Sequence, residues 1–219
     1  MRTHFLAAAI LTAAMLAGCH STPDPQQPPA PTPYSSAVHD SQNSPMMADT
    51  GPAGVGAAEA AASLADIKNA VAVVHPFSGS AVSGKVTFEQ TPDGVMVVAD
   101  IDGLTPGPHA IHIHEYGDIS DPKGMSAGGH YNPEHEMHGL PTSPHHHPGD
   151  MGNMMADSTG HAHLEIMLPS VTIAGDKDPI LGRSVIIHAK ADDGSQPVGN
   201  AGGRVGGGVI GVAKAPKPK

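Results

Sequence analysis

Residues 85–102 have the sequence KVTFEQTPDGVMVVADID, which predicts a β-hairpin. Apolar Val86 and Phe88 alternate with polar neighbours, the pattern of a strand with one buried face. The segment Thr91-Pro92-Asp93-Gly94 is rich in turn residues, and an apolar run then continues to Asp102. We take this hairpin as the centre of the predicted fold.

Short strands are also predicted on both sides of the hairpin, and no long helix is. The 27 Gly and 22 Pro suit turns and irregular loops. Two long loops, at about 115–157 and 189–206, are rich in Gly, Pro or His. This pattern predicts an all-β sandwich or barrel. The additional strands are expected at 71–74, 109–114, 164–168, 184–188 and 209–212.

The N-terminal part of the chain predicts export and lipid anchoring. Arg2 precedes a mostly apolar run, Phe5–Ala17, which is shorter than the ~20 residues of a membrane-spanning helix. The run ends in Leu16-Ala17-Gly18-Cys19, which resembles the bacterial lipobox, and Cys19 is the sole cysteine. We therefore expect a signal peptide at 1–18 and an acylated Cys19 in a lipid bilayer of the bacterial cell envelope, facing the periplasm or exterior.

The remaining 201 residues, 19–219, divide into a tether and one domain. Residues 19–66 are rich in Pro and Ala and lack a sustained period, which indicates a disordered spacer. Residues 67–219 form a domain of roughly 150 residues, enough to bury a core. The formal net charge of −10 disfavours nucleic acid as a partner. A small anionic substrate would need a local positive charge to offset the net negative charge of the chain.

Six histidines and one aspartate stand out as candidate metal ligands. His112 and His114 are two apart on a predicted strand, so they share one face. Imidazoles suit copper and zinc, and three imidazoles with one carboxylate suit zinc. The set could hold two adjacent metals if one ligand were shared, although chance clustering among 16 His stays open on composition alone. The remaining members are His130, His138, His147, Asp150 and His188.

The residues around these histidines resemble the copper/zinc superoxide dismutase family. The segment HAIHIHEYGD, residues 109–118, resembles the copper-binding strand of that family. Further motifs follow in the family's order, and the similarity covers roughly residues 70–213. These motifs are SAGGHYNP at 126–133, HPGDMGN at 147–153, VIIHAKADD at 185–193, GNAGGRV at 199–205 and GVIG at 208–211.

The resemblance implies a flattened eight-stranded Greek-key β-barrel with two long functional loops. It implies that superoxide is dismuted to oxygen and hydrogen peroxide by copper that cycles between Cu(II) and Cu(I). His130 would bridge copper and zinc and carry a proton, and Arg204 would attract the anion. Asp192 would hydrogen-bond one copper histidine and one zinc histidine. Copper would be held by His112, His114, His130 and His188, and zinc by His130, His138, His147 and Asp150.

The family spacing also separates ligands from neighbouring histidines. It selects His147 over His145 and His146, which we expect to be solvated. His135, His161 and His163 lie off the pattern and are expected at the surface.

One departure from the family concerns its usual intrachain disulfide. The matching positions here are Gly124 and Gly207, and Cys19 alone cannot form such a bond within one chain. Because a cross-link of this kind often contributes about 2–4 kcal/mol, something else must order the loop. Zinc binding is our hypothesis.

A different class of function is a non-enzymatic copper- or zinc-binding envelope lipoprotein that buffers or delivers metal. The excess of histidines and the Met-rich segment Met151–Met155 support it. A buffer would need neither Arg204 nor a shared His130. The oligomeric state, monomer or homodimer, is open.

Overall fold

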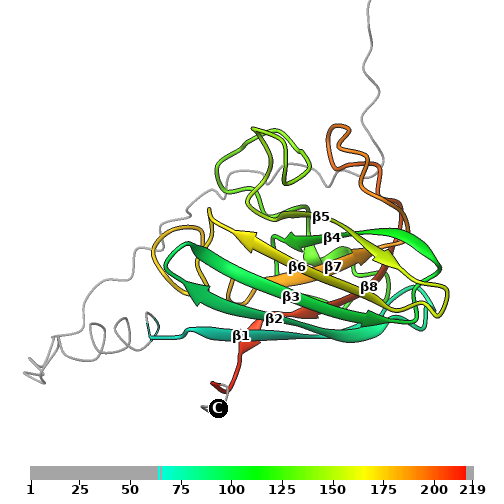
Figure 1. Ribbon diagram of the computed structural model, residues 1–219, viewed down its shortest axis with the longest axis horizontal. Helices are drawn as coiled ribbons and strands as arrows, with labels where there is room; N and C mark the ends of the chain where they lie inside the picture. The colour runs from blue at the N-terminus through cyan, green and yellow to red at the C-terminus, as the bar shows by residue number, and fades with distance from the viewer. Residues whose placement is uncertain (1–63, 65, 216–219) are drawn as a thin grey trace, which may run out of the picture. The chain divides into compact units, whose positions relative to one another are not determined.

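The predicted hairpin is present and forms part of a closed barrel (Figure 1). The computed structural model describes Leu64 and residues 66–215. Strands β2 (Ser83–Thr91) and β3 (Gly94–Asp102) pair along their whole length. Thr91 lies opposite Gly94, so Pro92 and Asp93 form a two-residue turn.

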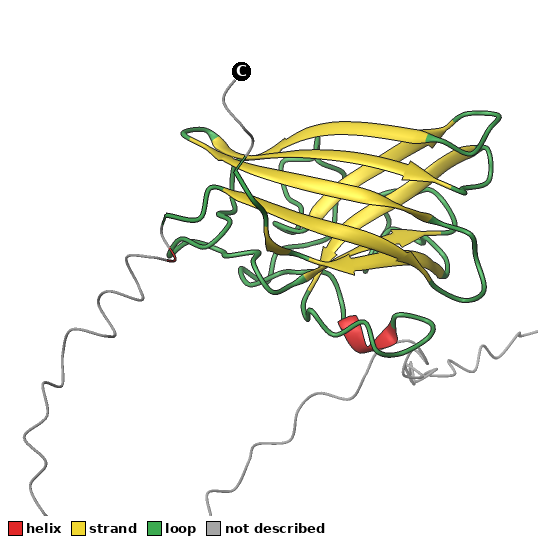
Figure 2. Ribbon diagram, turned by 90° about the horizontal axis from the view of Figure 1, so that it is seen from below, coloured by secondary structure: helices red, strands yellow, loops and turns green. Residues whose placement is uncertain are grey.

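Among the described residues, nine strands pair in the order β2-β3-β6-β5-β4-β7-β8-β1-β9. Since β1 also pairs with β2, strands β1 to β8 close into a barrel, and the predicted eight-stranded fold is confirmed. Figure 2 shows its two layers of strands. The connections β3–β4 and β6–β7 skip neighbours in the sheet, as in a Greek key. The other strands are β1 (Asn69–Pro76), β4 (Gly107–His114), β5 (Asp150–Ala156), β6 (Ala162–Leu168), β7 (Ser184–His188), β8 (Arg204–Val209) and β9 (Gly211–Val212).

The barrel interior is aliphatic. Alternate residues of each strand point inward, so Val86 and Phe88 are buried while Lys85 and Glu89 are exposed. The sequence has no Trp and three Phe, and isoleucine, valine and methionine fill most of the core. Burial of such side chains contributes about 1.5–3 kcal/mol each, which makes the barrel a rigid support for its loops.

Two predicted loop boundaries were wrong. The first loop ends at Gly149, because Asp150–Ala156 form β5 and pair with β4. The second ends at Gly203, because β8 begins at Arg204; the predicted strand 209–212 is the end of β8 and the short β9. Because these segments are rich in glycine and methionine, sequence reasoning did not predict strands there. They take strand geometry because a neighbouring strand supplies their backbone hydrogen bonds.

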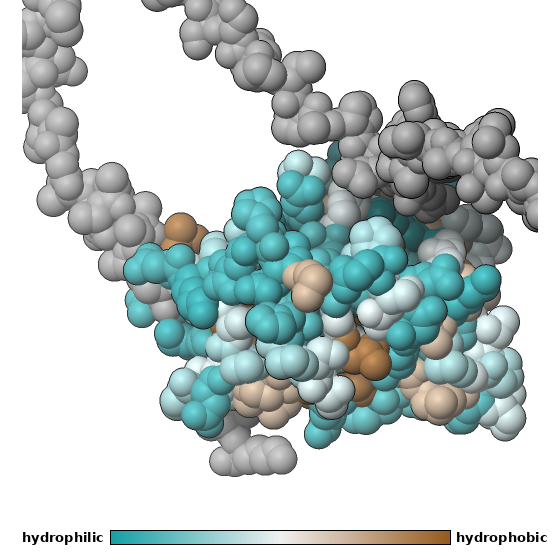
Figure 3. All heavy atoms as spheres, turned by 90° about the horizontal axis from the view of Figure 1, so that it is seen from above, coloured by the Kyte–Doolittle hydropathy of each residue, from teal (hydrophilic) through white to brown (hydrophobic). Residues whose placement is uncertain are grey.

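The two long loops, 115–149 and 189–203, lie on the same side of the barrel (Figure 1). That side is mostly hydrophilic, with small scattered hydrophobic patches (Figure 3). The described residues include no helix long and apolar enough to cross a membrane. The predicted signal peptide 1–18, Cys19 and nearly all of the tether 19–66 lie outside the described residues.

Candidate metal centre

Two neighbouring strands supply the first histidines of the centre. His112 and His114 lie on β4, and both are buried. Ile111 and Ile113, which alternate with them, belong to the main core, so the histidines face the outside of the barrel beneath the loops. Strand β7 pairs with β4 and ends at His188, which is therefore brought beside them.

Backbone pairing places His130 next to His114. The loop runs antiparallel to the end of β4, where Glu115 N donates to Gly129 O at 3.0 Å and Tyr131 N donates to Ile113 O at 2.8 Å. His114 and His130 form an isolated β-bridge between these bonds. The rings of His112 and His130 are 4.0 Å apart between centroids.

Three ring nitrogens of the four-histidine set, His112, His114, His130 and His188, have no hydrogen-bond partner among the described residues. His112 Nε2 donates to Asp192 Oδ2 at 2.8 Å, and His114 Nδ1 donates to Gly128 O at 3.0 Å. The opposite nitrogens therefore carry lone pairs. His112 Nδ1, His114 Nε2 and His188 Nε2 are buried with no hydrogen-bond partner among the described residues. Buried polar atoms left in this way are costly, which fits a cation as their partner. The four potential ligand atoms of His112, His114, His130 and His188 lie within 4.8 Å of one another.

A second set converges on the Asp150 carboxylate, at the start of β5. Its Oδ1 lies 2.9 Å from His130 Nδ1 and 3.2 Å from His147 Nδ1, and its Oδ2 lies 2.9 Å from His138 Nδ1. The backbone amides of His147 and Gly139 also donate to Oδ2. The ligand atoms of His130, His138, His147 and Asp150 again lie within 4.8 Å of one another. This donor set suits zinc.

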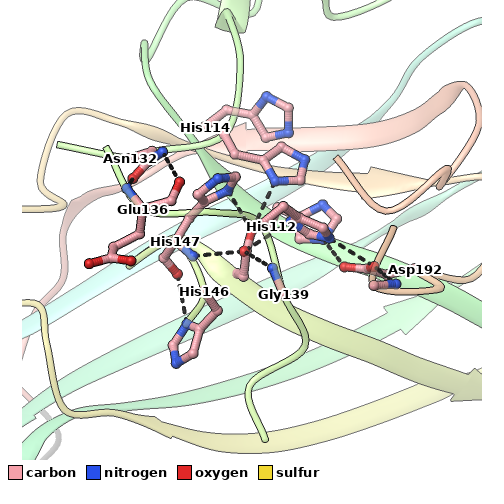
Figure 4. Close-up of polar contacts among 12 residues, drawn as sticks. His112, His114, Asn132, Glu136, Gly139, His146, His147 and Asp192 are labelled. Carbon is pink, nitrogen blue, oxygen red and sulfur yellow. Dashed lines mark hydrogen bonds and ion pairs between the residues drawn. The ribbon is translucent and has the colours of Figure 1, made fainter. Parts of the chain in front are cut away.

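Asp192 connects the two sets by accepting a hydrogen bond from one histidine of each. Its Oδ2 accepts from His112 Nε2, and its Oδ1 accepts from His138 Nε2 at 3.0 Å. Figure 4 shows the Asp192 carboxylate to one side of His112, with His147 beyond. Because Asp192 accepts the Nε2 protons, it fixes both rings with Nδ1 toward the centre.

Burial favours the neutral form of three histidines of the four-histidine set, His114, His130 and His188. Burial lowers the pKa of His130 to about 4, against the raising effect of Asp150. Burial and nearby cationic groups hold the pKa of His114 and His188 well below 6.5. Burial alone would lower the pKa of His138, but hydrogen bonding with Asp150 and Asp192 raises it to about 9. Neutral imidazoles are the form that binds metal.

Arg204 lies beside the four-histidine set. It begins β8 opposite His188 and is half-buried. Its Nη1 donates to Gly124 O, and its Nη2 donates to Gly128 O at 2.6 Å. The Gly128 carbonyl also accepts from His114, so one oxygen holds the guanidinium and a ring in fixed relation. The other N–H groups of the guanidinium have no hydrogen-bond partner among the described residues and can donate to an anion.

A family model described as copper/zinc superoxide dismutase matches residues 82–210 of this chain. The chain belongs to the copper/zinc superoxide dismutase family.

The relatives of this superoxide dismutase family member include animal proteins. The extracellular superoxide dismutase [Cu-Zn] of Brugia pahangi is 38% identical over 154 residues, which cover 66% of this chain and 76% of the relative. Superoxide dismutase [Cu-Zn] A of Xenopus laevis is 42% identical over 138 residues, covering 59% and 89% of the two chains. The solved structure of the clock protein EA4 is 38% identical with a TM-score of 0.61, over 67% of this chain and 95% of that one.

The five histidines that the family spacing set aside contribute no ring nitrogen to either set of this superoxide dismutase family member. His146 is half-buried and its ring turns to the His147 carbonyl, 2.9 Å away (Figure 4). His145 is exposed and paired with Glu136 at 3.1 Å. His161 and His163 are exposed and pair with Asp102 and Asp100, and His135 is exposed.

Sequence reasoning missed three residues that support the centre. Asn153 Oδ1 accepts from the Asp192 amide, and Asn153 Nδ2 donates to the Asp192 carbonyl. Gln196 makes a similar pair of bonds to the backbone of His138. Gly199 leaves room for the Asp192 carboxylate, because an ideal Cβ there would lie 2.0 Å from Oδ1. Nothing local marks Gln196, whereas Asn153 and Gly199 lie within quoted motifs without an assigned role.

Proposed function

We infer that this protein dismutes superoxide to oxygen and hydrogen peroxide, with copper and zinc as its metals. One observation carries the inference: His130 belongs to both convergent ligand sets, one of four histidines and one of three histidines with Asp150. The reaction is inferred from membership of the superoxide dismutase family, and the buried ring nitrogens without a hydrogen-bond partner are suited to bind metal ions.

We assign the copper-side ligands as His112 Nδ1, His114 Nε2 and His188 Nε2, together with His130 Nε2. The first three nitrogens are buried and unpartnered among the described residues, which supports the assignment. The zinc-side ligands are His130, His138, His147 and Asp150. The carboxylate contacts of 2.9–3.2 Å to three ring nitrogens support this set, since one metal can replace the protons these contacts would otherwise need.

His130 acts as the proton carrier in this proposal. Its Nδ1 is turned to Asp150, so its Nε2 faces the copper side. Copper, when bound, supplies a one-electron couple between Cu(II) and Cu(I), which zinc lacks. His130 takes a proton from solvent at Nε2 as the first superoxide gives up its electron and leaves as oxygen. It donates this proton to the peroxide formed from the second superoxide, and the second proton of hydrogen peroxide comes from solvent. Zinc, when bound by His130 Nδ1, Asp150, His138 and His147, would hold the ring in place.

Arg204 supplies the local positive charge that an acidic chain needs for an anionic substrate. The net charge of −10 repels superoxide at long range. The guanidinium is fixed by two loop carbonyls and lies close enough to His114 and His188 to lower the pKa of both. We propose that it draws superoxide toward the open side of the copper site.

The metal-buffer alternative loses its main support in the structure. Met151 and Met154 are fully buried in the barrel core, and Met155 alone of this strand's methionines is exposed. The surface histidines 145, 161 and 163 are paired with carboxylates. These contacts explain both features without a metal-storage role.

The test measures metal content and dismutase activity on one purified sample. We expect both copper and zinc to bind, with turnover. His138→Ala should lose zinc, whereas His145→Ala, a neighbour outside both sets, should keep both metals and full activity. Bound metals without turnover would favour the buffer.

We also propose that the chain is a lipoprotein of the bacterial cell envelope, anchored through Cys19. The lipobox-like segment supports this, and the extracellular relative is compatible with export. Intact mass of the membrane-fraction protein should show an acylated N-terminal Cys19, and Cys19→Ser should release the protein from the membrane. An unmodified mass at residue 19 would contradict the anchor.

A further inference from the structure

A small hydrophobic cluster lies apart from the main core. It contains Phe77, Ala127 and Ile186, with Ile119 packed against them. Phe77 directly follows β1, and Ile186 is on β7, whereas Ile119 and Ala127 belong to the loop 115–149. The Phe77 ring therefore connects the barrel wall to this loop.

The edge of the Phe77 ring fills the space between Gly124 and Gly207. An ideal Cβ on Gly124 would lie 2.7 Å from Phe77 Cε2, and one on Gly207 would lie 2.6 Å from the same atom. Both glycines are buried. These are the positions at which the family resemblance places the two cysteines of a disulfide. A side chain at either position must displace the ring.

The backbone next to the ring is held from two sides. Phe77 N donates to Val205 O of β8 at 2.9 Å, and Ser78 N donates to Pro122 O of the loop at 2.9 Å. Ser78 Oγ also donates to Arg204 O at 3.1 Å. Because both neighbours are hydrogen-bonded to this segment, the ring is fixed against both glycines.

The loop segment next to the Phe77 ring supplies the two carbonyl groups that accept hydrogen bonds from Arg204. The guanidinium rests on the carbonyls of Gly124 and Gly128, at the two ends of the short 3-10 helix Met125–Ala127. Ala127 of this turn is fully buried against the Phe77 cluster. A shift of the turn would move both carbonyls together.

We propose that Phe77 is a positioning residue: its ring takes the place of a cross-link between Gly124 and Gly207, and it fixes the turn on which Arg204 rests. The claim that Phe77 anchors the loop depends only on the packing described above. Its effect on turnover rests on the role of Arg204 in the proposed function. Zinc binding would order a different part of the loop, residues 132–149, which contain His138 and His147.

Hydrogen exchange on the metal-loaded full chain tests the anchoring. Phe77→Leu, which removes the ring but keeps an apolar side chain, should speed exchange of the Gly124 and Ala127 amides about tenfold. The matched control is Phe88→Leu, since Phe88 is also buried but lies in the main core. It should leave these two amides close to their wild-type rates. Equal effects of the two variants, or unchanged rates in Phe77→Leu, would overturn the proposal.

Zinc removal provides the converse experiment. It should speed exchange in residues 132–149 and leave the Gly124 and Ala127 amides protected. Loss of protection at these two amides on zinc removal alone, to the extent seen in Phe77→Leu, would mean that zinc rather than the ring holds the turn.

The kinetic readout is the dependence of kcat/KM on ionic strength. Phe77→Leu should flatten it in the same direction as Arg204→Ala, with metal content unchanged. If Arg204→Ala flattens the dependence and Phe77→Leu does not, the ring does not position the guanidinium. If Arg204→Ala itself has no effect, the proposed role of Arg204 fails, and the exchange result still decides the anchoring.

A designed disulfide tests whether the ring occupies the cross-link space. In a Cys19→Ser background, Gly124→Cys with Gly207→Cys should keep free thiols while Phe77 is present. Adding Phe77→Ala should let the bond close and restore slow exchange of the Ala127 amide on oxidation. Residue 124 has φ 69° and the residue-207 Cβ lies 2.8 Å from Val185 O, so closure requires small backbone shifts. Closure to the same extent with Phe77 in place would refute the steric argument.

Discussion

At the scale of single residues, the centre depends on which nitrogen of each ring is free. Asp192 accepts from His112 Nε2, and Gly128 O accepts from His114 Nδ1, so the two rings present opposite nitrogens. His112 and His114 share a strand face but differ in this respect. Hydrogen-bond partners, and not strand geometry alone, therefore define the ligand atoms.

Asp192→Asn should weaken metal binding. An amide has one oxygen and one NH2 group, so it cannot accept from both His112 Nε2 and His138 Nε2. We expect a loss of roughly 10–100-fold in metal affinity, measured by competition with a chelator. Asp193→Asn is the control, because Asp193 is exposed and contacts neither ring. An unchanged affinity in Asp192→Asn would remove it from this role.

Arg204→Ala should keep both metals and lower kcat/KM by about tenfold or more, with a flatter dependence on salt. The physical reason is the loss of a positive charge beside His114 and His188. Arg204→Lys should be intermediate, because an ammonium keeps the charge without the two-pronged bond to Gly124 and Gly128. Initial rates measured across ionic strength decide this. Identical profiles for wild type and Arg204→Ala would exclude steering.

At the scale of elements, the loop 189–203 is shaped around one carboxylate. Gly199 has φ 74°, and an ideal Cβ there would lie 2.0 Å from Asp192 Oδ1 and 2.6 Å from His138 Nε2. Both partners support the metal centre. The loop can close over them only with glycine at this position.

Gly199→Ala should displace Asp192 and reduce the occupancy of both metals. Left-handed backbone costs a non-glycine residue about 1–2 kcal/mol, and the clash adds to that. Gly203→Ala lies in the same loop, where an ideal Cβ meets no described atom within 4 Å and the backbone is not left-handed. Metal content after dialysis should fall in the first variant and stay at the wild-type level in the second. Equal occupancy in both would show that the loop can accommodate the methyl group.

At the scale of the whole molecule, the barrel buries several histidines that must stay neutral in the metal-free protein. Burial keeps the pKa of His114 and His188 well below 6.5 and lowers that of His130 to about 4. In the unfolded chain these histidines titrate near 6.5. Below that pH the unfolded state binds more protons, so folding is opposed.

The stability of the metal-free protein should therefore fall as the pH falls from about 6.5 toward 4. Each of the three histidines contributes up to about 1.4 kcal/mol per pH unit. His138 acts in the opposite sense, since a pKa raised to about 9 gives stability that is complete below 6.5 and is lost as the pH rises toward 9. It cannot offset the acid loss. Urea unfolding midpoints with a chelator present measure the profile, and a flat or rising midpoint on acidification would contradict it.

The sequence by itself determined the hairpin, the β class and the residues that gather at the centre. The first two follow from alternation along a strand, which is a local property, whereas the residues of the centre were selected by resemblance to the motifs of the family. The strand β5 escaped prediction because Asp150-Met151-Gly152 has little strand preference of its own and takes its geometry from β4.

Only the tertiary structure decided which ring nitrogens are free, how Gly128 O holds His114 and Arg204 together, and what lies between Gly124 and Gly207. Each depends on contacts between segments far apart in the chain, such as Phe77 with Gly207 or His138 with Gln196. Such contacts exist once the barrel closes and the loops pack on it, because burial and hydrogen-bond partners are properties of the folded arrangement and not of any one segment.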